Sequence, residues 1–149
     1  MPDEFVFVPG RTNNRVFYPC AISIPGVLEI RYHVVSLKRA PPPEGFTTVD
    51  MNLLHIPNLV AMISNVASAV MAKPSPFPQD AVQAEFGADW GASCRLALAQ
   101  STFAGSFTEC ILVGLHRNDV ADAYMFFMYD DFEAALPLVN RYFYTLRFS

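Results

Sequence analysis

The chain has 149 residues, of which 52% are hydrophobic and only 16% are charged, and its net charge is −4. An average soluble domain has about 25% charged residues, and this length suits a single domain over residues 1–149 that buries a sizeable core. Its only adjacent basic pair is Lys38-Arg39, which argues against binding to nucleic acid or to an anionic membrane surface.

The cysteines and the apolar segments bear on the compartment. Three cysteines with no CxxC pair do not suggest a disulfide framework. The first residues lack the basic and apolar regions of a secretory signal, so we expect a cytoplasmic protein with reduced thiols. The longest apolar stretch, residues 56–72, contains two asparagines and two serines. Because a membrane span needs roughly 20 mainly apolar residues, this stretch predicts a buried helix.

The N-terminal part of the chain predicts three strands. Residues 4–8 form a short apolar candidate, and residues 15–24 form a second one that Pro19 places at an edge or a bulge. After a Pro-Gly turn, residues 27–37 alternate between the two faces of a half-buried strand. One face would carry Leu28, Ile30, Tyr32 and Val34, and the other Glu29, Arg31 and His33.

The middle of the chain predicts one helix. A proline-rich loop at residues 38–45 precedes it, and residues 46–54 fit either a strand or an extended lead into the helix. Pro57 suits the first turn of a helix that runs to about Ala72. Its apolar stripe would be Leu59, Ile63, Val66 and Val70, with Asn58, Ala61, Asn65 and Ser68 opposite. Because the polar side is small and uncharged, we expect this helix to be covered on both sides.

The last third of the chain predicts three strands linked by hairpins. A proline-rich linker at residues 73–78 and an ambiguous stretch at residues 79–86 come first. A strand then begins near Gly91, and residues 108–116 and 121–129 follow after turn-forming residues. The final strand is apolar on both faces, which predicts a central position or burial at an interface.

A terminal helix is expected to close the sheet. Asp130 or Asp131 would cap its N-terminus, and Glu133 would interact with the helix dipole. The helix would run towards the chain end, with a buried stripe of Phe132, Leu136, Val139, Phe143 and Leu146. The predicted fold class is therefore α+β: an antiparallel sheet packed with two main helices as an α/β sandwich, with a C-terminal amphipathic helix.

Three features carry a resemblance to a known group. Arg31 lies in a strand that leads to Pro43-Glu44-Gly45-Phe46, a strand ladder covers residues 93–129, and the chain ends in Phe-Tyr-Thr-Leu-Arg-Phe-Ser. In these respects the chain resembles the PsbP-like α/β sandwich superfamily, which includes DcrB-like proteins and type VI secretion effector chaperones. The resemblance implies a non-enzymatic binder or assembly factor, and the secretion chaperones are dimers that shield hydrophobic helices. The element order also fits profilin-like and longin-like interaction modules.

No motif for catalysis, phosphate binding or metal binding stands out. The histidines are not spaced like metal ligands, and we expect no metal and no cofactor. If Ser93 lies opposite His116 in the hairpin, Cys94 and His116 form a conceivable nucleophile pair; a buried structural cysteine is the alternative. The same pairing places Glu109 opposite Gln100, where a general acid would need a second carboxylate.

The main functional hypothesis is a non-enzymatic, chaperone-like protein that presents an apolar sheet surface. The surface would be the face or edge of the sheet opposite the helices, and it would bind a protein partner, an apolar helical segment or a second subunit of a homodimer. The residues expected to bind are Tyr124, Phe126 and Met128, facing outward from the last strand, with Trp90 and Phe86 at the rim. The alternative is a small-molecule binding protein or enzyme with an apolar pocket between the sheet and helix 57–72. Its few polar groups would be Cys94, Glu109 and His116.

Overall fold

The computed structural model describes residues 6–12, 17–37, 51–101 and 103–148. The strands in these ranges are β1 (Val6–Thr12), β2 (Phe17–Ile24), β3 (Leu28–Ser36), β4 (Ala67–Pro76), β5 (Trp90–Leu98), β6 (Glu109–Arg117) and β7 (Ala121–Tyr129). The helices are α1 (His55–Val66), α2 (Gln79–Phe86) and α3 (Phe132–Tyr142), preceded by a short 3-10 turn, η1 (Met51–Leu53). Within the described ranges the strands form one sheet, in the order β1-β2-β3-β7-β6-β5-β4. The predicted α+β class is confirmed.

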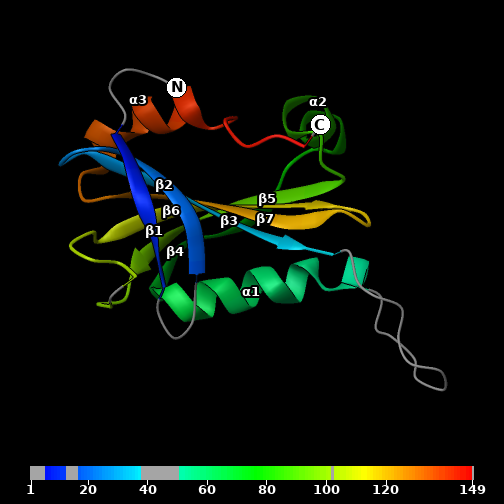
Figure 1. Cartoon of the computed structure of the whole chain (residues 1–149), viewed down its shortest axis with the longest axis horizontal. Helices are drawn as coiled ribbons and strands as arrows, with labels where there is room; N and C mark the ends of the chain where they lie inside the picture. The colour runs from blue at the N-terminus through cyan, green and yellow to red at the C-terminus, as the bar shows by residue number, and fades with distance from the viewer. Residues whose placement is uncertain (1–5, 13–16, 38–50, 102, 149) are drawn as a thin grey trace.

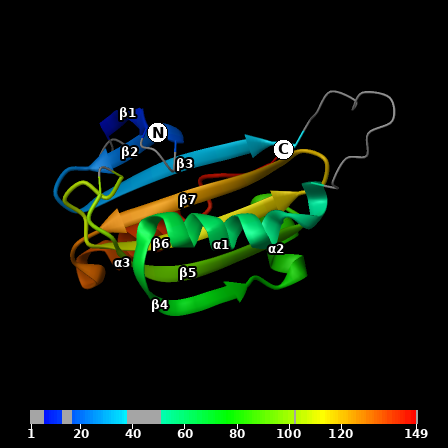
Figure 2. The same ribbon diagram turned by 90° about the horizontal axis from the view of Figure 1, so that it is seen from below.

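Helices cover both faces of the sheet. Figure 1 shows α1 on one face and α2 and α3 on the other, and Figure 2 shows α1 lying along the central strands. Each face has its own apolar cluster: Leu59, Ile63 and Val66 of α1 pack on one side, and Val82, Phe86 and Val139 of α2 and α3 pack on the other. The sheet is therefore the middle layer of three, because each face must bury its apolar side chains.

Two antiparallel meanders meet at the centre of the sheet. The first comprises β1, β2 and β3, and the second comprises β5, β6 and β7. They join where β3 pairs with β7, from Glu29 opposite Met128 to Ser36 opposite Ala121. All nine residues of β7 are buried, as expected for a strand with neighbours on both edges and helices on both faces. The predicted central position of this strand is confirmed.

The predicted helix over residues 57–72 is wrong in its second half. The helix ends at Val66, and Ala67 begins the edge strand β4, which pairs with β5. Val70, expected in the buried stripe, is about half exposed. These residues form a strand because it covers the otherwise unpaired edge of β5, and because Pro74 and Pro76 cannot continue a helix.

The final helix begins as predicted and ends earlier. The Asp131 side chain accepts hydrogen bonds from the backbone N–H groups of Glu133 (3.1 Å) and Ala134 (3.4 Å), so Asp131 is the cap. The helix ends at Tyr142, and the following segment runs to α2, where the Phe148 N–H donates to the Phe86 carbonyl (2.8 Å). The fully buried positions of the helix are Ala135, Val139 and Tyr142. Of the predicted stripe, Val139 is fully buried, and Phe132, Phe143 and Leu146 are partly buried against the same cluster.

The N-terminal strands also differ in extent from the prediction. The first strand covers Val6–Thr12 and includes a Pro-Gly pair that was expected to end it at residue 8. The second covers Phe17–Ile24, and the third keeps the predicted alternation, with Leu28 and Ile30 towards α3 and Glu29 and Arg31 towards α1. The proline-rich loop and most of the undecided stretch at residues 46–54 lie outside the described residues; its end, Met51–Leu53, is a 3-10 turn.

Candidate functional site: a groove beside α1

A groove lies between α1 and the two strands β3 and β7. Its volume is about 260 Å³, and it is lined by Val35, Asn58, Ala61, Met62, Asn65 and Tyr124. The four helical residues recur at intervals of three and four, so they occupy one flank of α1. Leu59, Ile63 and Val66 occupy the neighbouring face, which is buried on the sheet. The groove is therefore a consequence of how α1 sits on β7: one side of the helix is packed, and the next remains open.

The lining is uncharged and has its polar groups at two ends. Asn58 and Asn65 are seven residues apart, which corresponds to about 10 Å along a helix axis. Ala61 and Met62 fill the space between them. None of the lining residues is ionised, and α1 has no acidic residue in its first turn and no basic residue in its last. A mainly apolar wall with a few placed polar groups is the usual composition of a small-molecule site.

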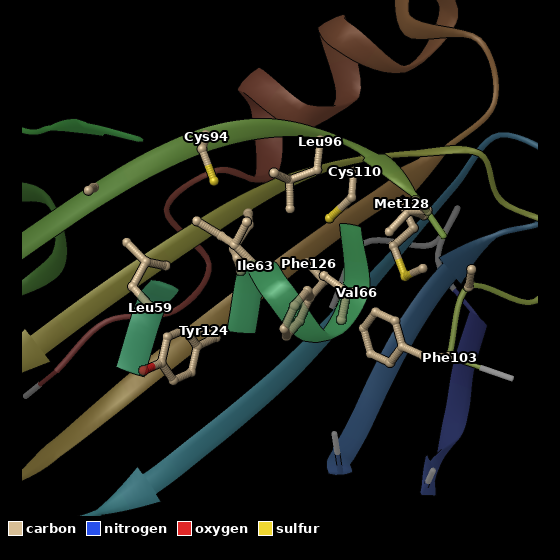
Figure 3. Packing of buried hydrophobic residues seen from close by; sticks show 14 of the residues in the cluster. Leu59, Ile63, Val66, Cys94, Leu96, Phe103, Cys110, Tyr124, Phe126 and Met128 are labelled. Carbon is tan, nitrogen blue, oxygen red and sulfur yellow. The ribbon is translucent and has the colours of Figure 1, made fainter. Parts of the chain in front are cut away.

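Tyr124 forms the base of the groove. Its side chain is almost fully buried, and Figure 3 shows it beside Leu59 on the α1 side of the sheet. Burial raises the pKa of the phenol well above its ordinary value, and the nearby Asp122 charge raises it further. The hydroxyl therefore stays protonated at neutral pH and is available as a donor. The ring of His33 stacks against the Tyr124 ring with 6.0 Å between centroids.

A buried histidine–aspartate pair lies next to the groove. His116 Nδ1 is 2.6 Å from Asp122 Oδ1, and both residues are about 1% exposed. His116 Nε2 is 2.8 Å from Oδ1 of Asn118. Both ring nitrogens face oxygen atoms, so the ring donates to both when it is doubly protonated; a singly protonated ring requires the Asn118 amide to turn its NH₂ group towards Nε2.

The pair is connected to the groove through Asn58. The Nδ2 atom of Asn58 donates to the second oxygen of Asp122, Oδ2, at 3.3 Å. One carboxylate therefore binds His116 on β6 with one oxygen and the first turns of α1 with the other. A carboxylate with a partner for each oxygen has a fixed orientation. Asp122 on β7 therefore fixes the orientation of Asn58 at one end of the groove.

Aromatic stacking encloses the same network on its outer side. The ring of His55, the first residue of α1, lies 4.5 Å from the His116 ring at an interplanar angle of 20°, and 4.7 Å from the ring of Trp90. His55 Nδ1 is 3.0 Å from the carbonyl oxygen of Asn52. Because a carbonyl only accepts, the Nδ1 atom of His55 carries a hydrogen and donates it.

A loop contact positions the turn after β6. The Asn118 backbone N–H donates to Asp89 Oδ2 (2.8 Å), and Asn52 exchanges two hydrogen bonds with Asp119. Asp119 has φ of 63°, which is the left-handed region that aspartate tolerates better than most residues. The turn, η1 and the start of β5 are therefore tied together around the buried pair.

A second buried charged group lies further along the same face. Arg31 on β3 is paired with Glu29 and donates to the carbonyl oxygen of Phe103, and its guanidinium lies 4.9 Å from the centroid of the Phe103 ring. Burying such a charge is tolerated only with several partners. Here the partners hold the loop between β5 and β6 over the sheet, which closes this end of the α1-side cluster.

Four of the five residues predicted to bind a partner are in the core. Tyr124, Phe126 and Met128 point towards α1, and Figure 3 shows them within the apolar cluster there; Phe86 is buried in the cluster on the opposite face. The expectations that the three last-strand residues face outward and that Phe86 lies at the rim are wrong, because helices occupy both faces over β5–β7 and leave no open sheet face there. Trp90 is half-buried at the rim beside His55.

Cys94, Glu109 and His116 do not converge. Cys94 lies opposite Leu112, and Trp90 rather than Ser93 lies opposite His116. The predicted register, which assumed a loop at residues 102–107, is off by three residues because the loop between β5 and β6 begins earlier and spans residues 99–108. Burial raises the pKa of Cys94 to about 11, so the thiol is protonated at neutral pH. Glu109 lies opposite Ala97 and is bound by Arg95 at 2.7 Å.

The sequence interpretation missed three residues of the site. Asn58 and Asn65 were recognised only as the polar side of a helix, and Asp122 was not singled out. The signal that was present is the pair of asparagines seven apart on a helix without charges. What was lacking is the position of β7 under that helix, which brings Asp122 and Tyr124 to it.

Comparison with protein-family models, curated proteins and solved structures found no match for this chain. Over the described ranges, no helix is long and apolar enough to cross a membrane. In the same part of the chain, no three histidine, cysteine or acidic side chains converge as metal ligands would.

Proposed function

We propose that this protein is a non-enzymatic binding protein that holds a small, mainly apolar molecule in the groove between α1 and strands β3 and β7. The observation that carries the proposal is the uncharged lining of that groove, with apolar side chains between two asparagines. Its volume of about 260 Å³ is near the lower end for ligand sites, which is about 300 Å³. The ligand is accordingly small.

The chemistry around the groove favours binding over catalysis. The candidates for a reactive role are engaged elsewhere: Glu109 is bound to Arg95, and His116 to Asp122 and Asn118. The Cys94 thiol is buried and protonated. A catalytic nucleophile needs an adjacent base and an accessible position, and the residues that line the groove supply neither.

A matched pair of fluorescent probes tests the proposal. N-Phenyl-1-naphthylamine is neutral and apolar, and its 8-sulfonate has the same skeleton with a negative charge. We expect saturable binding of the neutral probe with one site per chain, and much weaker binding of the sulfonate. Ala61→Phe would fill the middle of the groove and should lower the affinity at least about tenfold, which corresponds to about 1.4 kcal/mol.

Val60→Phe is the control for that variant. Val60 is exposed on the neighbouring flank of the same helix, so the substitution adds the same ring outside the groove. Binding should be unchanged in this variant. If neither probe binds, or if both variants weaken binding equally, the groove is not the site and the proposal fails.

A second candidate function is association through apolar side chains on the other flank of α1. Ile56 and Val60 are each more than half exposed, and Val70 and Met71 of the adjacent strand β4 are about half exposed. Exposed apolar residues on neighbouring elements are typical of interaction surfaces. The free edge of β4 is poorly suited to pair with a strand of another chain. Its register with β5 shifts repeatedly, and Lys73 and two prolines lie on it. The side chains would therefore make the contact, and a second copy of this chain is the proposed partner.

Light scattering over a hundredfold concentration range tests this second function. We expect the mass to rise from one chain to two, and Val60→Glu to hold the protein as a monomer, because burying the added charge is costly. Ala134→Glu places the same charge on an exposed position of α3 and should leave association unchanged. A mass of one chain throughout would contradict the dimer.

A further inference from the structure

We infer that the ligand of the groove is an uncharged molecule with an N–H or O–H group, which donates a hydrogen bond to Oδ1 of Asn58. This inference rests on the proposed small-molecule function and specifies the ligand class. It depends on one structural fact: the orientation of the Asn58 amide is set from behind, by residues outside the groove.

The orientation follows from the hydrogen bond to Asp122. A carboxylate oxygen can only accept a hydrogen bond. The Asn58 atom at 3.3 Å from Asp122 Oδ2 is therefore the amide nitrogen, Nδ2. The carbonyl oxygen of the amide is then the end directed away from the carboxylate. In the part of the chain that the structure describes, Oδ1 of Asn58 accepts no hydrogen bond. A ligand in the groove therefore meets an acceptor at this end.

Asp122 is in turn prevented from rotating. Its Oδ1 atom is bound by His116 at 2.6 Å, and the other side of that ring is bound by Asn118. Because His116 and Asp122 are both about 1% exposed, water does not compete for these bonds. His116 and Asp122 are thus positioning residues, and Asn58 is the residue that contacts the ligand.

The rest of the lining determines the charge of the ligand. An ion would lose hydration in the groove without gaining a partner of opposite charge, which is unfavourable. Tyr124 remains a neutral phenol that can donate, and Asn65 offers a carboxamide at the opposite end. The ligand class is therefore neutral, apolar in its middle, and provided with at least one donor.

Isosteric compounds test the donor directly with the unmodified protein. Diphenylamine and diphenyl ether differ by N–H against O, as do carbazole and dibenzofuran. Titrations followed by backbone amide chemical shifts should show the N–H member of a pair binding roughly five- to tenfold more tightly, the usual contribution of one hydrogen bond. The shifts should be concentrated on α1, β3 and β7.

Variants of the two asparagines locate the acceptor. Asn58→Leu should abolish the preference for the N–H compounds while the ethers keep their affinity. Asn65→Leu, two turns along the same flank, should retain the preference. Asp122→Asn should reduce the preference as well, since a carboxamide there can donate to Asn58 and turn its amide around. A merely structural role of Asp122 would lower the affinity for both members of a pair and leave their ratio unchanged.

The outcomes separate this inference from the proposed function. If neither member of any pair binds in the groove, the small-molecule function itself fails. If both members bind equally well in the groove and Asn58→Leu changes nothing, the function stands and the assignment of Asn58 as the acceptor is overturned. If charged analogues bind as tightly as neutral ones, the uncharged ligand class is overturned.

Discussion

The two faces of the sheet are built from different chemistry. Among the described residues, the buried acidic and basic side chains are Glu29, Arg31, His116 and Asp122, and all of them project to the side of α1. The face under α2 and α3 closes with phenylalanine rings instead: Phe127 stacks on Phe143 at 5.8 Å, and Phe86 on Phe77 at 5.5 Å. The face under α2 and α3 also has an ion pair, Arg95–Glu109, but its side chains are partly exposed, whereas the pairs on the α1 side are buried.

This difference indicates where specificity lies. Apolar packing stabilises the fold and has little directional preference, whereas a buried polar network is expensive unless each member is paired. On the α1 side, a paired polar network of this kind lies beside the open groove. The opposite side is packed by the apolar cluster of α2 and α3. Substitutions on the two faces should therefore have different consequences.

The largest effect is expected for Phe126→Asp. Phe126 is completely buried beneath α1, and the substitution removes a large side chain, worth about 3–5 kcal/mol, and buries an unpaired charge, which costs several kcal/mol more. Because a typical domain is stable by about 5–15 kcal/mol, we expect loss of cooperative unfolding in circular dichroism. A folded variant would show that the α1 face tolerates solvent at its centre.

Asp122→Ala should have the next largest effect. Removing one member of a buried pair leaves His116 without its partner and costs about 3–5 kcal/mol, measured as a shift of the urea midpoint. Asp130→Ala is the control: Asp130 is exposed and accepts one hydrogen bond, from Thr108, so it should cost no more than about 1 kcal/mol. Equal losses would remove the distinction between the buried network and surface acids.

A pair of glycines tests how the α3 side is closed. Gly87 has φ of +62°, and an added Cβ would clash with the Phe148 carbonyl oxygen; Gly26 has φ of +77° and open space around it. Gly26→Ala should cost only the backbone penalty of about 1–2 kcal/mol. Gly87→Ala should cost more, because the segment after α3 must move. Thermal unfolding of both variants measures the difference, and identical losses would show that this contact is not needed.

The smallest effect is expected from alkaline pH. Burial raises the pKa of Cys94 to about 11, above the value of about 8.5 for an exposed thiol. Between these values the unfolded chain binds fewer protons than the folded one, so stability falls as pH rises. We expect Cys94→Ala to reduce this loss in urea unfolding followed from pH 8 to 11. An unchanged pH dependence would place the thiol in contact with water.

Local patterns were sufficient where one element determines its own structure. The double-sided apolar run of residues 121–129 predicted a central strand, and Asp131 with Glu133 predicted the start of the last helix. Both signals depend on nearest neighbours in the chain. The alternation of residues 27–37 similarly assigned each side chain to the correct face of the sheet.

Prediction failed where distant segments compete for the same residues. An alanine-rich stretch such as Ala67–Pro76 has no strong preference for helix or strand. It forms a strand because it pairs with the otherwise open edge of β5. The hairpin register depended on how much of residues 99–108 forms a loop, which composition alone does not determine. The groove was recognisable only in part, since Asn58 and Asp122 are 64 residues apart and meet through the sheet order.

The pairing of β3 with β7 has a consequence for the order of folding. The partners Glu29 and Met128 are 99 residues apart in a chain of 149, and closing so large a loop is slow. During synthesis, β1, β2 and β3 therefore lack their neighbour in the sheet until β7, the last strand of the described ranges, has left the ribosome. We expect β5, β6 and β7 to acquire protection from hydrogen exchange first, and the N-terminal meander to be the last part to acquire it.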